Sequence, residues 1–304
     1  MATRHEYVSG KPYVIIVDPI NKCNLRCPLC PSGTGDLNRD RTVMSYQQFT
    51  EIIRPFIKYA YEISFHNWGE SLLNPEVFKM ISFAAQHNIA SNMSSNLSIT
   101  QAGIMGEIVG SGLEYLVVSL DAASPEVYRQ YRRGGNFDLV ISNLRSLIAT
   151  RNARGSKTPR IEWQFIVMKH NMHEVEQAQT LAREIGVDTF RLIPVGFPFG
   201  VKNLNDLRRE WAPDSLPMSE PIDSTCFYLY RSVTINPDGG VSPCCMVPDA
   251  KYDFGNLLSD DFENIWNNDF YRSARRLFLS KTGTGCKIVC NSCTKFRKMG
   301  DVSS

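Results

Sequence analysis

Three cysteines near the N-terminus have the spacing of a metal-binding loop. They follow the apolar run at residues 13–17, which reads as a β-strand, in the pattern C-x3-C-x2-C: Cys23, Cys27 and Cys30. Three thiolates on a short loop can hold three irons of a [4Fe-4S] cube, whereas a closed zinc or iron-sulfur site takes four protein ligands. The fourth iron is then open, and an open metal position indicates chemistry. A zinc loop or three unrelated buried cysteines are the alternatives.

The residues around these cysteines resemble a known family. The segment at residues 21–28, Asn-Lys-Cys-Asn-Leu-Arg-Cys-Pro, is similar to the cysteine loop of the radical S-adenosylmethionine (SAM) superfamily. The resemblance implies that SAM chelates the open iron, and that one electron cleaves SAM to a 5'-deoxyadenosyl radical, which takes a hydrogen atom from a substrate carbon. It also implies a one-electron donor of the flavodoxin or ferredoxin type.

Further landmarks of that family follow at expected strand ends. The segment at residues 67–70 resembles the Gly-Gly-Glu motif that binds the methionine amino group, with Trp68 where the first glycine is usual. Ser119 and Asp121 could instead end a strand and start a turn. Arg132 or Arg133 is a further candidate partner of the SAM carboxylate. The residues that the resemblance assigns to SAM binding are Leu29, Gly69, Glu70, Asn96, Ser119 and Gln164.

Six more cysteines lie after residue 225. Two all-cysteine [4Fe-4S] clusters would need eight thiolates, so six support one cluster with two thiols to spare. The spacings C-x17-C and C-x2-C, with an Asp-Gly-Gly turn at residues 238–240, resemble the twitch module, a shortened SPASM domain. A structural zinc site is the alternative, and Cys286 could replace one ligand. The resemblance implies one auxiliary [4Fe-4S] cluster on Cys226, Cys244, Cys290 and Cys293.

The spare thiols indicate the reaction. If Cys245 returns a hydrogen atom to the opposite face of the substrate carbon, the product is an epimer, as in related enzymes that act on aminoglycosides. We therefore predict an epimerase of a sugar or aminocyclitol, with Cys245 as the catalytic residue. A dehydrogenase that passes the electron to the auxiliary cluster is the next hypothesis, followed by a peptide maturase. An iron-sulfur or zinc binding protein is the non-enzymatic alternative, in which Cys245 is a small buried hydrophobe.

The composition limits the partners. The 304 residues carry 33 basic and 31 acidic side chains, so the net charge of +2 favours neither nucleic acid nor membrane. The chain starts without a signal-peptide pattern, and no run approaches the ~18 apolar residues of a membrane span. We expect a cytoplasmic enzyme with a small-molecule substrate. Nine cysteines in a reducing compartment favour metal ligation over disulfides.

Alternating strands and helices must position these residues. Six strand–helix units require a mainly parallel α/β sheet, and the pattern alone leaves open a doubly wound sheet or a curved barrel. The family resemblance implies a partial (β/α)6 radical SAM barrel with a small cysteine-rich β-hairpin/α domain after it. We predict the barrel at residues 1–195, a linker or lid at 196–223 and the C-terminal domain at 224–304. The expected strands are at residues 13–17, 62–65, 91–93, 116–120, 162–168 and 190–195.

Overall fold

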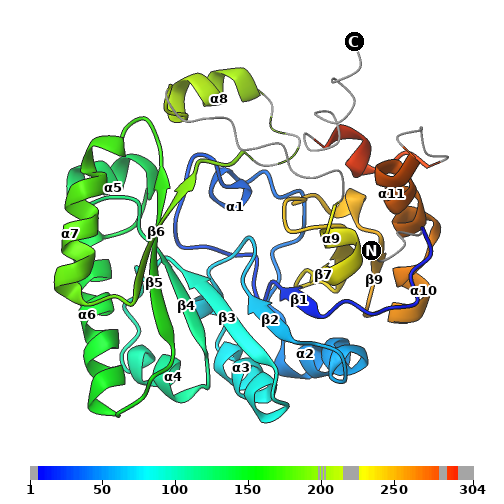
Figure 1. The fold of residues 1–304 in the computed structure, drawn as a ribbon, viewed down its shortest axis with the longest axis horizontal. Helices are drawn as coiled ribbons and strands as arrows, with labels where there is room; N and C mark the ends of the chain where they lie inside the picture. The colour runs from blue at the N-terminus through cyan, green and yellow to red at the C-terminus, as the bar shows by residue number, and fades with distance from the viewer. Residues whose placement is uncertain are drawn as a thin grey trace.

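The structure is a computed structural model that describes residues 6–197, 199, 201, 203–214, 226–280 and 286–293. One mainly parallel sheet runs through its centre in the order β6-β5-β4-β3-β2-β1-β7-β8-β9 (Figure 1). Within the described residues, the edge strands β6 and β9 do not pair with each other. The sheet is therefore an open partial barrel, and the predicted fold is confirmed. The first six strands are β1 (Val14–Val17), β2 (Glu62–Phe65), β3 (Ala90–Ser95), β4 (Tyr115–Ser119), β5 (Arg160–Val167) and β6 (Thr189–Pro194).

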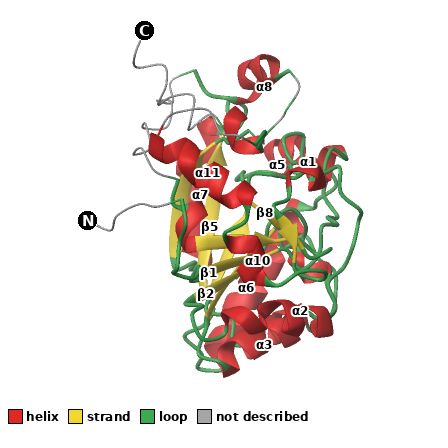
Figure 2. Ribbon diagram, turned by 90° about the vertical axis from the view of Figure 1, so that its right-hand side faces the viewer, coloured by secondary structure: helices red, strands yellow, loops and turns green. Residues whose placement is uncertain are grey.

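Helices cover the convex side of this sheet, as parallel crossovers require (Figures 1 and 2). The buried side chains of the strands, such as Phe65, Leu116 and Trp163, pack against them and form the main core. The helices after β1 to β5 are α1 (Pro31–Thr34), α2 (Tyr46–Ile53), α3 (Val77–Gln86), α4 (Ile104–Gly110), α5 (Pro125–Tyr131), α6 (Phe137–Ala153) and α7 (Val175–Ile185).

The sequence predicts two helix starts, a capping box at Ser45 and Gln48 and an Asn-Pro-Glu pattern at residues 74–76, and their outcomes differ. The capping box before α2 is confirmed, because the Ser45 side chain accepts from Gln48 N and the Gln48 side chain accepts from Ser45 N. The start of α3 at Asn74 is wrong, since the helix begins at Val77. The Asn74 side-chain oxygen accepts from Glu76 N at 2.8 Å, while its amide group donates to the carbonyl oxygens of Pro19 and Met44, which ties the loop to β1 and α2.

The two faces of the sheet differ in polarity. A parallel sheet that is buried on both faces usually has near-continuous apolar strands. Here β3 and β5 alternate, and the face away from the helices carries Asn92, Ser94, Glu162 and Gln164. A polar concave face requires a polar occupant or internal hydrogen bonds.

The C-terminal region continues the same sheet. The predicted hairpin is present as β7 (Ser232–Ile235) and β8 (Gly240–Ser242), but β7 also pairs with β1 in parallel, residue Ile16 opposite Thr234. The apolar positions Phe262, Ile265, Trp266 and Tyr271 predict one helix after the hairpin, but the structure has two, because the chain turns at Asn267 and Asn268. The remaining elements are α9 (Tyr228–Arg231), β9 (Gly255–Asn256), α10 (Phe262–Trp266) and α11 (Asp269–Ser280).

The predicted linker or lid at residues 196–223 is partly described. It contains α8 (Leu204–Trp211), which lies at the end of the molecule opposite α2 and α3 in both views (Figures 1 and 2). Trp211 is buried and contacts the Tyr131 ring edge-on, with 5.4 Å between ring centroids. This part of the predicted lid is therefore packed on α5. Residues 215–223 of that prediction lie outside the described residues.

Candidate active site and cofactor-binding residues

The N-terminal cysteines lie on the loop between β1 and α1. The backbone N–H of Cys30 donates to Cys27 O at 3.1 Å, and Leu25 N–H donates to the Cys23 sulfur at 3.4 Å. A side chain on Gly33 would put its Cβ 2.5 Å from the backbone of Cys27, so only glycine allows this close return of the chain. The loop is thus folded tightly around the thiols.

The chemistry of these thiols suits metal ligands. Burial raises the pKa of Cys23 to about 12 and that of Cys27 to about 11, and the neighbouring thiols of the loop raise these two values further. The Arg132 guanidinium opposes this shift at Cys27. Three neighbouring thiols with an N–H donor and a cation beside them fit an iron-sulfur cluster, whose binding displaces the thiol protons.

The segment around Gly69 packs directly on the cysteine loop. The Asp18 carboxylate, at the end of β1, accepts from Trp68 N at 3.2 Å and from Gly69 N at 3.4 Å, and burial raises the pKa of Asp18 to about 7. A Cβ on Gly69 would lie 1.6 Å from Ile20 O. This close backbone approach requires glycine at position 69, whereas Trp68 is accommodated because its position does not carry that contact.

Glu70 joins three segments at the ends of the strands. Glu70 is 3% exposed, and its carboxylate accepts from Leu72 N at 3.2 Å, from Asn96 N at 2.8 Å and from the Ser95 side chain, while burial raises the pKa of Glu70. The Asn96 amide donates to Asn24 Oδ1 at 2.9 Å, beside Cys23. A carboxylate has about four acceptor positions, so Glu70 retains capacity for a ligand's ammonium group.

The remaining predicted SAM contacts lie on or near the concave face. The Ser94 and Ser119 hydroxyls are 3.0 Å apart, and Ser119 is opposite Gln164 in the sheet. Leu29, which is 6% exposed, belongs to an apolar cluster with Tyr131 and Trp211. Arg132, a candidate partner of the SAM carboxylate, forms an ion pair with Asp121 at 2.6 Å.

A cavity of about 780 Å³ opens along this concave face. The predicted SAM contact Gln164 lines it, with His66 and Arg191. Burial lowers the pKa of His66 to about 4, and its Nδ1 has no hydrogen-bond partner among the described residues. Arg191 was not among the predicted site residues, although the alternation of polar residues along residues 160–167 was a signal for a polar inner face.

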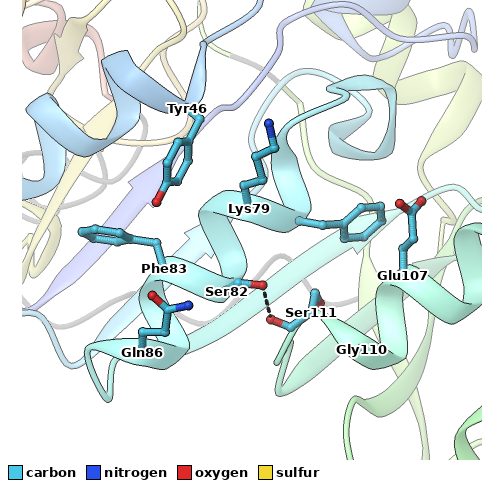
Figure 3. Close-up of a pocket in the computed structure, with 9 residues that line it drawn as sticks. Tyr46, Lys79, Ser82, Phe83, Gln86, Glu107, Gly110 and Ser111 are labelled. Carbon is cyan, nitrogen blue, oxygen red and sulfur yellow. Dashed lines mark hydrogen bonds between the residues drawn. The ribbon is translucent and has the colours of Figure 1, made fainter.

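Another cavity lies on the outside of the barrel between α2, α3 and α4 (Figure 3). It has a volume of about 500 Å³ and is lined by Tyr46 and Phe83, with Lys79 at its edge. The Ser82 hydroxyl donates to Ser111 O across its floor. None of the predicted site residues lines this cavity.

The C-terminal cysteines converge from three segments. Burial raises the pKa of Cys244 well above its usual range, and the nearby thiols of Cys245, Cys290 and Cys226 raise it further. Burial likewise raises the pKa of Cys290, with smaller contributions from Cys226 and Cys293. The four predicted auxiliary ligands are therefore neighbours, although Cys226 precedes α9, Cys244 follows β8, and Cys290 and Cys293 lie in and directly after the turn at Val289–Ser292.

Cys245 lies between this group and the Gly69 segment. The Asn67 side-chain amide is oriented so that both its NH2 group and its oxygen are hydrogen-bonded. The NH2 group donates to Cys245 O at 3.0 Å, and the oxygen accepts from Trp68 Nε1 at 3.0 Å. On the other side, the nearby Cys245 thiol raises the pKa of the Tyr228 hydroxyl. Cys286, the other spare cysteine, instead adds to the raised pKa of Arg276 through its proximity.

A buried arginine connects the two regions. Arg39, from the stretch after α1, contacts Asp238 and Asp253 of the C-terminal hairpin region at 2.7 Å each, and its side chain is 1% exposed. Asp253 also accepts from the Ser242 hydroxyl at 2.7 Å. The stretch after α1 and the hairpin region are thus held together by charge-assisted hydrogen bonds.

The comparisons with known families agree with this geometry. Residues 17–178 match the radical SAM superfamily, and residues 226–294 match SPASM, an iron-sulfur cluster-binding domain. The chain belongs to the radical SAM superfamily and carries a SPASM domain, as predicted. Its cofactors are SAM, the [4Fe-4S] cluster that binds SAM and an auxiliary [4Fe-4S] cluster.

Relatives of known kind span most of the chain. The probable GTP 3',8-cyclase of Methanocaldococcus jannaschii is 25% identical over 77% of this chain and 85% of its own length. The mycofactocin maturase of Mycobacterium tuberculosis is 24% identical over 83% of this chain and 70% of its own. The crystal structure of Streptococcus suis SuiB bound to S-adenosylmethionine superposes with a TM-score of 0.68, at 16% identity, over 87% of this chain and 68% of SuiB.

These findings define the kind of protein. It is a radical SAM enzyme, which acts on a small molecule or a peptide and needs a reductant. In the described part of the chain, no helix is both long and apolar enough to span a bilayer.

Proposed function

We propose that this enzyme epimerises a carbon of a sugar or aminocyclitol. In this proposal Cys23, Cys27 and Cys30 ligate the SAM-binding cluster, and Leu29, Gly69, Glu70, Asn96, Ser119 and Gln164 contact SAM. Cys226, Cys244, Cys290 and Cys293 ligate the auxiliary cluster. The substrate occupies the concave face of the sheet.

The chemistry needs a hydrogen-atom donor on the protein. When bound and reduced, the cluster and SAM supply a 5'-deoxyadenosyl radical that removes one hydrogen atom from the substrate carbon. Cys245 then breaks its S–H bond and returns a hydrogen atom to the opposite face of that carbon. The sulfur is left as a thiyl radical. One electron from a flavodoxin or ferredoxin and one proton from solvent restore the thiol.

The position of Cys245 carries the proposal. Its backbone is hydrogen-bonded to Asn67, two residues before the Gly69-Glu70 segment proposed to bind SAM. It therefore lies between the two cofactor sites. The polar side chains of the concave face, among them Asn92, Ser94 and Gln164, offer donors and acceptors that suit a hydroxyl-rich substrate.

Replacing Cys245 by alanine tests this role. We expect Cys245→Ala to keep both clusters and SAM cleavage but to form no epimer, while the wild-type enzyme in deuterated water places one deuterium on the inverted carbon. A thiol exchanges its hydrogen with solvent, whereas a carbon-bound hydrogen does not. Mass spectrometry and NMR of the products of a panel of sugars and aminocyclitols provide the measurement. Cys286→Ala is the matched control and should retain epimer formation.

Two other reactions are outcomes of the same experiment. A ketone that has lost two mass units, without deuterium, would identify a dehydrogenase that uses the auxiliary cluster as the electron acceptor. A peptide maturase is the second candidate, favoured by the similarity to mycofactocin maturase over 83% of this chain. Radical cleavage of SAM that responds to peptides and not to sugars would replace our proposal with that function.

A further inference from the structure

One arginine on the concave face is held in place with most of its donors unused. In the sheet, Ser119 on β4 is opposite Gln164 on β5, and Gln164 is opposite Arg191 on β6. Neighbouring strands are about 4.8 Å apart, so Arg191 lies roughly 10 Å across the sheet from Ser119. That separation fits a small substrate placed beside SAM.

The hydrogen bonds of Arg191 orient its guanidinium. Its Nε donates to Glu162 Oε1 at 2.7 Å, and one terminal nitrogen donates to Gln164 Oε1 at 2.9 Å. These bonds use two of the five N–H groups of an arginine. The side chain is 51% exposed and lines the 780 Å³ cavity. Three N–H donors therefore remain without a protein partner among the described residues.

The nearby carboxylate does not compete for a ligand. Glu162, whose side chain is 5% exposed, accepts from Arg191 and, at 2.7 Å, from the Tyr115 hydroxyl. Its charge is balanced by the guanidinium that it orients. The other carboxylates that line the cavity, Glu62 and Glu114, are at the starts of β2 and β4, at the same end as Arg160. The end of the cavity near SAM is thus dominated by the Arg191 cation.

We propose that Arg191 binds an anionic oxygen group of the substrate, a phosphate or a carboxylate. A planar guanidinium matches two oxygens of either group in a bidentate geometry, and the bonds to Glu162 and Gln164 pre-orient it. This inference rests on the proposed function and narrows its substrate class to acidic carbohydrates. Arg191 is then a specificity-determining residue beside the SAM site.

Calorimetric titration of the reconstituted enzyme with SAM bound tests the inference. The probes are glucose 1-phosphate, glucuronate and uncharged glucose. We expect at least one anionic sugar to bind about tenfold or more tightly than glucose. Whichever of glucose 1-phosphate and glucuronate binds more tightly identifies the anionic group of the substrate as a phosphate or a carboxylate. Equal affinity for glucose and both anions would overturn the proposal.

Variants separate recognition from folding. Arg191→Gln would leave Glu162 buried without its cation. Arg191→Lys is therefore the informative change, because lysine keeps the positive charge but lacks the planar guanidinium that binds two oxygens at once. We expect Arg191→Lys to lose about tenfold in anion affinity with unchanged iron content and SAM affinity. Arg183→Lys, on the surface of α7, should change neither. Unchanged anion affinity in Arg191→Lys, or a parallel loss of SAM affinity, would refute the assignment. Anion binding without epimerisation would leave this subsite standing and reject only the epimerase.

Discussion

The two cysteine groups of this enzyme are built in different ways. Cys23, Cys27 and Cys30 lie on one loop after β1, where the chain itself keeps the thiols close. The four C-terminal cysteines come from three segments between residues 226 and 293, and they meet because β8 pairs with β7, α9 packs on β7, and α11 packs on α9 and on the turn at Val289–Ser292. A ligand set on one loop can be recognised from spacing alone, whereas a dispersed set depends on the whole fold.

The fold also joins the two groups. Because β7 pairs with β1, the hairpin region starts beside the strand that carries the cysteine loop. Arg39 contacts Asp238 and Asp253 across this junction, and Asn67 contacts Cys245. The division into a barrel and a C-terminal domain remains a prediction, but the two regions share one sheet and a buried ion-pair network.

Removing the loop cysteines should have the largest effect. With Cys23, Cys27 and Cys30 all replaced by alanine, we expect iron to fall from about eight to about four atoms per chain, following the four-iron unit. Cleavage of SAM to 5'-deoxyadenosine should be abolished, as measured by chromatography under dithionite. If SAM cleavage persists, these cysteines do not hold the catalytic cluster.

Removing the dispersed cysteines should have a narrower effect. The double variant Cys244→Ala/Cys290→Ala should also lose about four irons. It should still cleave SAM, because the loop site is intact, yet form no product. Iron analysis and 5'-deoxyadenosine assays distinguish this outcome from that of the loop variant. One zinc with only four irons in the wild-type protein would reject the auxiliary ligand assignment.

Breaking the junction tests whether the two regions are one structural unit. Arg39→Met leaves Asp238 and Asp253 without their cation, and loss of one partner from a buried pair costs about 3–5 kcal/mol. We expect the free energy of unfolding in urea to fall by about that amount. Arg41→Met, at an exposed position two residues later, should change it by less than about 0.5 kcal/mol. Equal effects of the two variants would mean that the regions are stabilised independently.

The smallest expected effect is on SAM affinity. Ser119→Ala and Glu70→Ala each remove a proposed contact to SAM, and a hydrogen bond of this kind is worth about 1–2 kcal/mol, or roughly tenfold in Kd. Iron content should not change. Ser82→Ala, which lies at the outer cavity, is the matched serine control. If SAM titrations give wild-type affinity for both variants, the family motifs have been assigned to the wrong positions.

Local patterns predicted much of this fold. The observed β2 has the predicted bounds, and the other five strands begin or end within about two residues of their predicted limits. The capping box at Ser45 and Gln48 and the hairpin around Gly239 are also present. These features depend on residues that are neighbours in the chain. The start of α3 was predicted too early: the Asn74 side-chain oxygen accepts from Glu76 N at 2.8 Å, but the helix begins only at Val77, and the Asn74 amide also binds Pro19 and Met44, which lie far from it in sequence.

The sequence by itself determined the cysteine loop, the order of strands and helices and the family to which the chain belongs. Short-range spacing carries this information, because few conformations connect residues that are only a few positions apart. Only the tertiary structure decided that β7 extends the sheet beside β1, that Asn67 contacts Cys245, and that Arg191 shares a row with Gln164 and Ser119. Such contacts join segments tens to hundreds of residues apart, and their loop-closure entropy is offset only when the whole core packs.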